Sequence, residues 1–140
     1  DGLAVALRGY GASVHYHGRG YEFTDVGGRT AYEYLIDITD HVGFDLDAAS
    51  ALAAGLDPVD LRERLGDRAP LFHPTDHDGV TGDRVPLGGG DLDLAACAEA
   101  HAAEGGAWMV HEHAWESTPD DPVGVDGALA EAAGLIGTSR

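Results

Sequence analysis

Potential metal ligands end four short apolar runs in this chain. The runs close on His15 and His17, on Asp45 and Asp47, on His73, and on Glu112 with a histidine on either side. Ionisable groups are costly to bury unpaired, so their repeated placement after apolar runs indicates a shared role. Imidazole and carboxylate groups together suit a divalent ion such as Mn²⁺, Co²⁺, Zn²⁺ or Mg²⁺. Such an ion would polarise bound carbonyl and hydroxyl oxygens and make a neighbouring C–H more acidic.

The apolar runs alternate with segments of helical pattern, which predicts parallel β/α repeats. We expect strands at 12–16, 42–46, 70–73 and 108–111. Helices are expected at 30–40, 59–65, 91–103 and 125–136, with residues 1–10 forming the end of another. The carboxyl ends of parallel strands lie at one edge of a sheet, so the four ligand runs should converge there.

The spacing of the ligands fixes which of them share a face of a strand. Residues two apart point to the same face, so His15 goes with His17 and Asp45 with Asp47. Glu112 faces away from its two histidine neighbours. Asp45 lies one step deeper than Asp47, and we interpret it as structural.

The remaining polar residues receive simpler interpretations. Arg84 stands in a long polar loop at 76–91, where it would bind a substrate oxygen or phosphate, or stay exposed. Cys97 lies among alanines in a predicted helix and is interpreted as a packing residue. Three histidines fall in turns or helices and are expected to be solvated: His41, His77 and His101.

Composition limits the partners of this chain. Its 140 residues fit one domain, and its 25 acidic against 8 basic residues give a net charge of −17. This field repels nucleic acid and anionic membranes, so neither is expected as a partner. Acidity dominated by aspartate is typical of salt-adapted proteins. A GC-rich coding bias would explain the absence of lysine but not the acidity.

No segment indicates export or membrane insertion. The chain shows no apolar stretch of membrane-helix length and no signal-peptide pattern at residue 1. Its single cysteine has no disulfide partner. We therefore expect a cytoplasmic protein.

Five segments resemble motifs of the sugar phosphate isomerase/epimerase group, the xylose isomerase-like TIM barrels. Residues 14–23 (VHYHGRGYEF) resemble its HNHxxEF segment, and 42–58 (VGFDLDAASALAAGLDP) resemble vgxxlDxxhxxxaGxDP. Residues 71–76 (LFHPTD) resemble HxKD, 88–94 (GGGDLDL) a GxGxxdf turn, and 110–112 the closing strand with its glutamate. The match keeps its order over nearly the whole chain.

The resemblance implies a fold and a ligand set. In that family these segments are the fifth to eighth strands of an eight-stranded (β/α)8 barrel. Residues 1–140 would then be the C-terminal portion of one barrel domain, with the N-terminal half missing. The implied metal ligands are His15, Asp47, His73 and Glu112.

Further catalytic and substrate-binding roles are expected of other residues of the chain. Glu112, His17 and Glu22 would move protons or bind substrate hydroxyls, and Arg84 and Ser50 would contact the substrate.

Three positions depart from the family pattern. His15 stands where well-studied epimerases carry a glutamate acid/base, Ser50 where a histidine is frequent, and Thr75 where HxKD has lysine. Glu22 lies one residue from the position of a second glutamate.

The leading hypothesis is a metal-dependent sugar or sugar phosphate isomerase or epimerase that abstracts a proton next to a carbonyl. Its substrate would be a small sugar or polyol. Whether the chain forms a homo-oligomer is left open. A dehydratase of inosose or keto-acid type is the nearest alternative, favoured by His15. An endonuclease IV-like repair enzyme is disfavoured by the charge. A non-catalytic barrel fragment would bind no stoichiometric metal ion.

Overall fold

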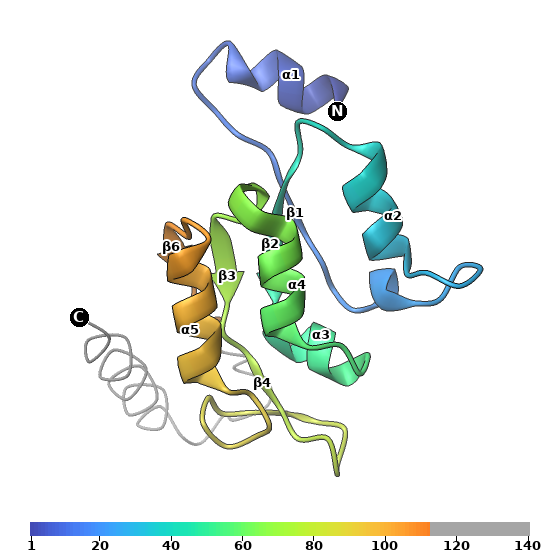
Figure 1. Cartoon of the computed structure of the whole chain (residues 1–140), viewed down its shortest axis with the longest axis vertical. Helices are drawn as coiled ribbons and strands as arrows, with labels where there is room; N and C mark the ends of the chain where they lie inside the picture. Colours follow the sequence, from blue (N-terminus) through green and yellow to red (C-terminus); the bar gives the residue numbers. More distant parts are fainter. Residues whose placement is uncertain (113–140) are drawn as a thin grey trace.

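Four parallel strands form the larger of the two sheets in residues 1–112, the part of the chain that the computed structural model describes (Figure 1). In sheet order they are β1 (His15–His17), β2 (Gly43–Asp47), β3 (Leu71–His73) and β6 (Trp108–Met109). All three pairings are parallel, which confirms the predicted β/α repeats. The helix expected at 125–136 lies outside the described residues.

Helices follow the strands much as predicted. They are α1 (Gly2–Arg8), α2 (Ala31–Ile38), α3 (Ala48–Ala53), α4 (Pro58–Leu65) and α5 (Leu94–Ala103), with single 3₁₀ turns at Tyr21–Phe23 and Gly66–Arg68. Within residues 1–112 no helix is both long and apolar enough to cross a membrane.

Capping residues set the starts of the longer helices. Thr30 and Glu33 form a capping box on α2, in which each side chain accepts a backbone N–H from the other residue. Asp57 caps α4, and Pro58 occupies its first turn, where no N–H partner is needed. Asp93 caps α5 by accepting from the Ala96 N–H. These caps fix where each helix leaves the sheet edge.

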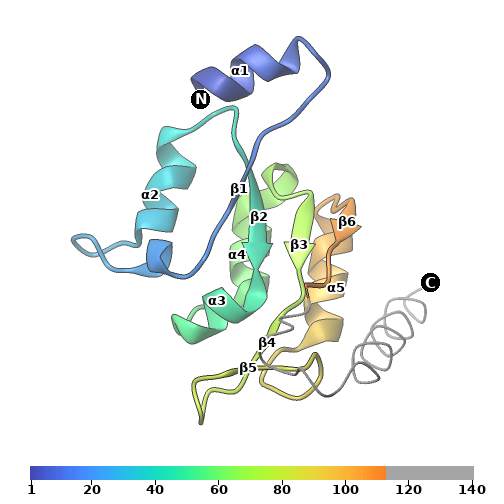
Figure 2. The same ribbon diagram turned by 180° about the vertical axis from the view of Figure 1, so that it is seen from behind.

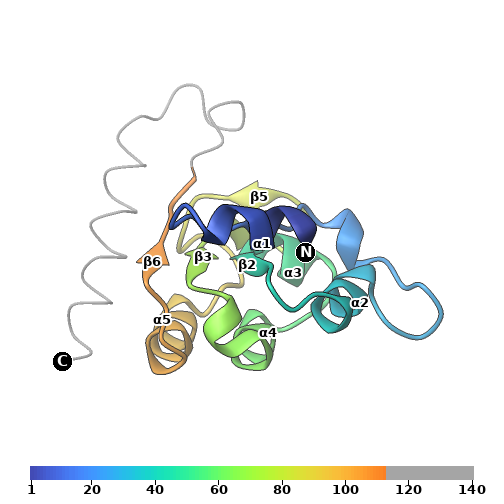
Figure 3. The same ribbon diagram turned by 90° about the horizontal axis from the view of Figure 1, so that it is seen from above.

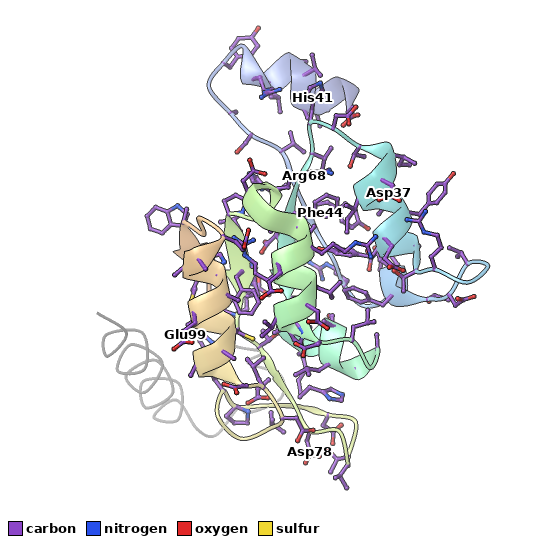
Figure 4. All side chains as sticks on the ribbon, viewed as in Figure 1. Asp37, His41, Phe44, Arg68, Asp78 and Glu99 are labelled. Carbon is purple, nitrogen blue, oxygen red and sulfur yellow. The ribbon has the colours of Figure 1, made fainter. Side chains whose placement is uncertain are left out.

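The hydrophobic core lies between the sheet and helices α4 and α5, which run side by side along one face (Figure 3). Phe44, Leu46 and Phe72 alternate with the ligand residues along β2 and β3 and are fully buried. Arg68 stacks over the Phe44 ring at 5.0 Å and donates to the backbone carbonyls of Ile36 and Val42 (Figure 4). It therefore ties the end of α2 to the start of β2.

Two histidines that we expected to be solvated, His77 and His101, are buried. Arg62 of α4 is completely buried, and its Nε donates to His101 Nδ1 at 3.0 Å. The same guanidinium donates to the carbonyls of Gly66 and Glu104, at the ends of α4 and α5. The prediction for His101 was wrong because the partner that satisfies its ring lies on another helix. Cys97 is buried in α5, as predicted.

Candidate metal centre

The parallel pairings put the carboxyl ends of β1, β2 and β3 at one edge of the sheet, which Figure 2 shows from the side opposite α4 and α5. Because Phe44, Leu46 and Phe72 face the core, the ionisable residues that alternate with them lie on the opposite face of the sheet. His17 is the last residue of β1, and His73 is the last residue of β3. Asp45 of the intervening strand β2 pairs in register with His17. The predicted convergence is thus found for three of the four strands.

His17, Asp45 and His73 form a compact cluster. One nitrogen or carboxylate oxygen from each residue lies within 4.8 Å of the others. Asp45 Oδ2 is 3.1 Å from His17 Nδ1 and 2.9 Å from His73 Nε2. The imidazoles meet edge to face, with ring centroids 4.7 Å apart. One carboxylate oxygen therefore orients both rings.

The charges of the cluster are coupled. Burial raises the pKa of Asp45, but the hydrogen bonds and charges of His73 and His17 outweigh burial and hold the pKa below its ordinary value. Burial lowers the pKa of His73, and its contact with Asp45 reverses this, so the net pKa is raised. The cluster thus favours a carboxylate beside a basic imidazole.

The residues of the cluster fit a divalent ion. Asp45 Oδ1 and His73 Nδ1 are buried and have no hydrogen-bond partner within residues 1–112. Unpaired buried polar atoms are costly, and metal coordination is one way to satisfy them. Two imidazoles and one carboxylate suit zinc and its borderline neighbours.

Glu112 lies at the rim of the cluster. Its Oε2 is 3.9 Å from His73 Nδ1, and its side chain is 58% exposed. Glu112 therefore lies on the same side of the sheet as His73. Its carboxylate is beside the cluster and accessible to a bound molecule.

Asp47 lies on the same face as the cluster but is held by other partners. It is fully buried, caps α3 through the Ser50 N–H at 2.7 Å, and accepts from Thr75 Oγ1 at 3.1 Å. Arg84 donates to Asp47 Oδ1 at 2.8 Å and to Ser50 Oγ at 3.2 Å. The structure thus brings together the two predicted substrate-binding residues, Arg84 and Ser50, with Asp47 between them.

His15 is the first residue of β1, two residues before the carboxyl end of the strand. Its Nε2 is 2.8 Å from Ser13 Oγ, and its ring covers Gly43, where a Cβ would meet His15 Nδ1 at 2.3 Å. Of the two histidines of β1, the structure places His17 rather than His15 in the cluster. The role of His15 as a ligand stays a prediction.

The structure does not bring Glu22 to the cluster. This side chain is buried, and its two oxygens accept from the Tyr16 hydroxyl and from the Arg19 N–H. These bonds keep its pKa low despite burial, which acts to raise it. Tyr16 points to the opposite face from His17, because neighbours on a strand alternate. Glu22 therefore fixes the turn after β1.

Asp45 is the cluster residue that our sequence interpretation set aside as structural. Its two-residue spacing from Asp47 showed the shared face, but depth along the strand depends on the pairing of β1 with β2. The ligand set inferred from the sequence shares His73 with the cluster, together with Glu112 at its rim.

Comparison with known proteins identifies the fold. No family model matches the chain, and no curated protein matches it. A solved sugar phosphate isomerase/epimerase from Parabacteroides distasonis ATCC 8503 superposes with a TM-score of 0.77 at 22% identity, covering 97% of this chain and 49% of that one. A xylose isomerase domain protein from Planctomyces limnophilus gives 0.69 at 21% identity, covering 98% and 50%.

A third solved structure is the IOLI protein with a binding zinc atom, with a TM-score of 0.68, 18% identity, and coverage of 99% of this chain and 54% of that one. The fold is therefore that of a partial TIM barrel. The chain spans about half the length of the solved structures that it matches. The order of the motifs predicts that this half is the C-terminal one.

Proposed function

We propose that the cluster is a divalent metal centre and that the protein is a sugar isomerase or epimerase acting by proton abstraction next to a carbonyl. The convergence of His17, Asp45 and His73 carries the proposal, because their ligand atoms lie within 4.8 Å of one another. The solved structures with this fold support it, since they include a sugar phosphate isomerase/epimerase and the IOLI protein with a bound zinc atom.

Each residue has a task that follows from its surroundings. Asp45 orients both imidazoles through Oδ2, so His17 and His73 are held for ligation before an ion arrives. A bound divalent ion would polarise a substrate carbonyl and stabilise an enediolate. Glu112 is exposed beside His73 and is suited to accept or return the proton. Arg84 and Ser50 present donors to substrate oxygens.

Metal binding by the 140-residue chain is the first test. We expect titration with Co²⁺ to show one bound ion per chain. Its visible absorption bands should be those of Co²⁺ bound to nitrogen and oxygen ligands. His73→Ala should weaken this affinity by at least about 100-fold, since even loss of an outer contact costs 10–100-fold. The matched control is His41→Ala, because His41 is exposed and lies just before β2 begins, away from the carboxyl ends of the strands (Figure 4).

The absence of stoichiometric Co²⁺ binding would contradict the proposal and favour a non-catalytic barrel fragment. For the reaction, the metal-loaded chain would be incubated with sugars and polyols in D₂O. Deuterium at the carbon next to the carbonyl, in an isomerised or epimerised product, supports the proposal. Loss of water from an inosose or keto acid would instead show the dehydratase alternative.

A further inference from the structure

The loop from 76 to 92 is folded around one buried carboxylate. Asp76 is 2% exposed, and its oxygens accept four backbone N–H groups. The donors are His77 at 2.8 Å and Leu92 at 2.9 Å to Oδ1, and Gly88 at 2.9 Å and Gly90 at 3.1 Å to Oδ2. Four donors offset the cost of burying this carboxylate, which has no cationic partner within residues 1–112.

The fold around Asp76 leaves little room for adjustment. A Cβ on Gly90 would lie 2.5 Å from Asp76 Oδ1 and 2.5 Å from the His77 carbonyl. The Asp91 N–H also donates to that carbonyl, at 2.9 Å. The returning segment is thus pinned at both sides of Gly90, and its position depends on the Asp76 carboxylate.

The same loop carries Arg84. Asp76 and His77 form strand β4 (Asp76–His77), which pairs antiparallel with β5 (Arg84–Val85), so that Asp76 lies opposite Val85 and His77 opposite Arg84. From there Arg84 reaches Asp47 and Ser50. Its side chain is 44% exposed, so few packing contacts hold it in place.

We propose that Asp76 is a positioning residue. Its buried carboxylate folds the 76–92 loop so that Arg84 contacts Asp47, beside the cluster of His17, Asp45 and His73. This sets the charge at the cluster, because Asp47 is the register partner of His73 and Arg84 neutralises it. Only the metal-affinity test below rests on the proposed function.

Amide exchange and unfolding test the position of the loop without any metal. Asp76→Asn leaves one oxygen that accepts hydrogen bonds and replaces the other with an NH₂ group, which cannot accept a backbone N–H. The backbone amides of Gly88, Gly90 and Leu92 should therefore exchange with solvent at least about tenfold faster. In the wild-type chain, the effects of Arg84→Gln and Asp47→Asn on the free energy of unfolding in urea should not add, since the two side chains are paired. In the Asp76→Asn background the two shifts should become additive.

The matched control is Asp78→Asn, in the same loop (Figure 4). Asp78 also accepts two backbone N–H groups, from Val80 and Thr81, but within the loop tip. This variant should leave the Arg84 coupling intact. If Asp76→Asn does not fold, Gly90→Ala serves instead, because its methyl group displaces the returning segment while keeping the carboxylate.

Co²⁺ affinity separates positioning from a purely structural role. Arg84→Gln and Asp76→Asn should each tighten Co²⁺ binding severalfold, by leaving Asp47 unneutralised, and the double variant should bind no tighter than either. A general loosening of the fold would weaken binding instead. The proposal is overturned by unchanged coupling of Arg84 to Asp47 in the Asp76→Asn background, or by weakened Co²⁺ binding. Failure of the wild type to bind Co²⁺ would contradict the proposed function, and the exchange and coupling measurements would still decide the role of Asp76.

Discussion

Asp45 and Asp47 share a strand face but differ in what surrounds their carboxylates. Asp45 contacts only imidazoles through Oδ2, and its other oxygen is free of hydrogen bonds within the described residues. Asp47 is occupied by a helix N-terminus, a hydroxyl and a guanidinium. The Asp45 carboxylate thus keeps one oxygen available to a bound ion, whereas both oxygens of Asp47 already have partners.

We therefore expect Asp45→Asn to weaken Co²⁺ affinity more than Asp47→Asn does. Loss of Asp45 removes a ligand and the group that orients both imidazoles, so the effect should be at least about 100-fold. Calorimetric titration of the two variants provides the measurement. The reverse order would restore Asp47, with His15, as the ligand predicted from the sequence.

Much of this site is readable from the sequence, because period-two spacing and strand ends are local features. They place the two histidines and the two aspartates on one face and bring them to one edge. Which pair meets depends on register, and here His15 lies opposite Gly43 while His17 lies opposite Asp45. Gly43 has no side chain to keep the His15 ring away, and this contact is a property of two strands rather than one.

At the scale of elements, Arg62 joins the ends of α4 and α5. Its guanidinium lies where the carbonyls at both helix ends concentrate negative potential, and the charge of Glu104 adds to this potential. The arrangement requires an unprotonated Nδ1 on His101 as the acceptor of the Arg62 Nε–H. Burial lowers the pKa of His101, and the charge of Arg62 lowers it further.

This pair predicts a pH dependence of stability. As pH falls through about 6.5, His101 of the unfolded chain takes up a proton that the folded chain resists. The stability contributed by the neutral ring is thus fully present above that pH and is lost below it. The contribution of His101 to the free energy of unfolding, measured in urea, should therefore fall between pH 7.5 and pH 5.5.

His101→Gln keeps an acceptor for Arg62 and should flatten this dependence, whereas His41→Gln, at an exposed site, should not. Because His73 is present in every variant, its opposite contribution cancels in the comparison. An equal slope in wild type and His101→Gln would contradict the assignment.

The elements that sequence reasoning missed are those held by tertiary bonds. Helix α3 has six residues, and its start depends on Asp47 and on the Ala49 N–H donating to Thr75 Oγ1 at 3.0 Å. The β4–β5 hairpin depends on Asp76. The longer helices were predicted well because Thr30, Asp57 and Asp93 cap them from within their own segments.

At the scale of the molecule, the sheet corresponds to half of a barrel. Among the described residues β1 and β6 are its edge strands, and Trp108 on β6 is 68% exposed. The assignment of residues 1–140 as the C-terminal portion of one barrel domain stays a prediction, as do its substrate and its compartment.

The net charge of −17 predicts a protein that is stabilised by salt. Carboxylates repel one another in the folded chain, and the screening length falls from about 10 Å at 0.1 M to about 3 Å at 1 M salt. Calorimetry should therefore show a melting temperature that rises with KCl. Sucrose serves as the uncharged control for solute exclusion. A maximum at low KCl would reject salt adaptation.

Cys97 is the only thiol of the chain, and it is 2% exposed inside α5. Burial, with a smaller effect from nearby aspartates, raises its pKa to about 12. Because the thiolate is the reactive form, an alkylating reagent has no target while α5 is seated on the sheet. The time that passes before Cys97 is alkylated therefore measures the time before the native structure opens.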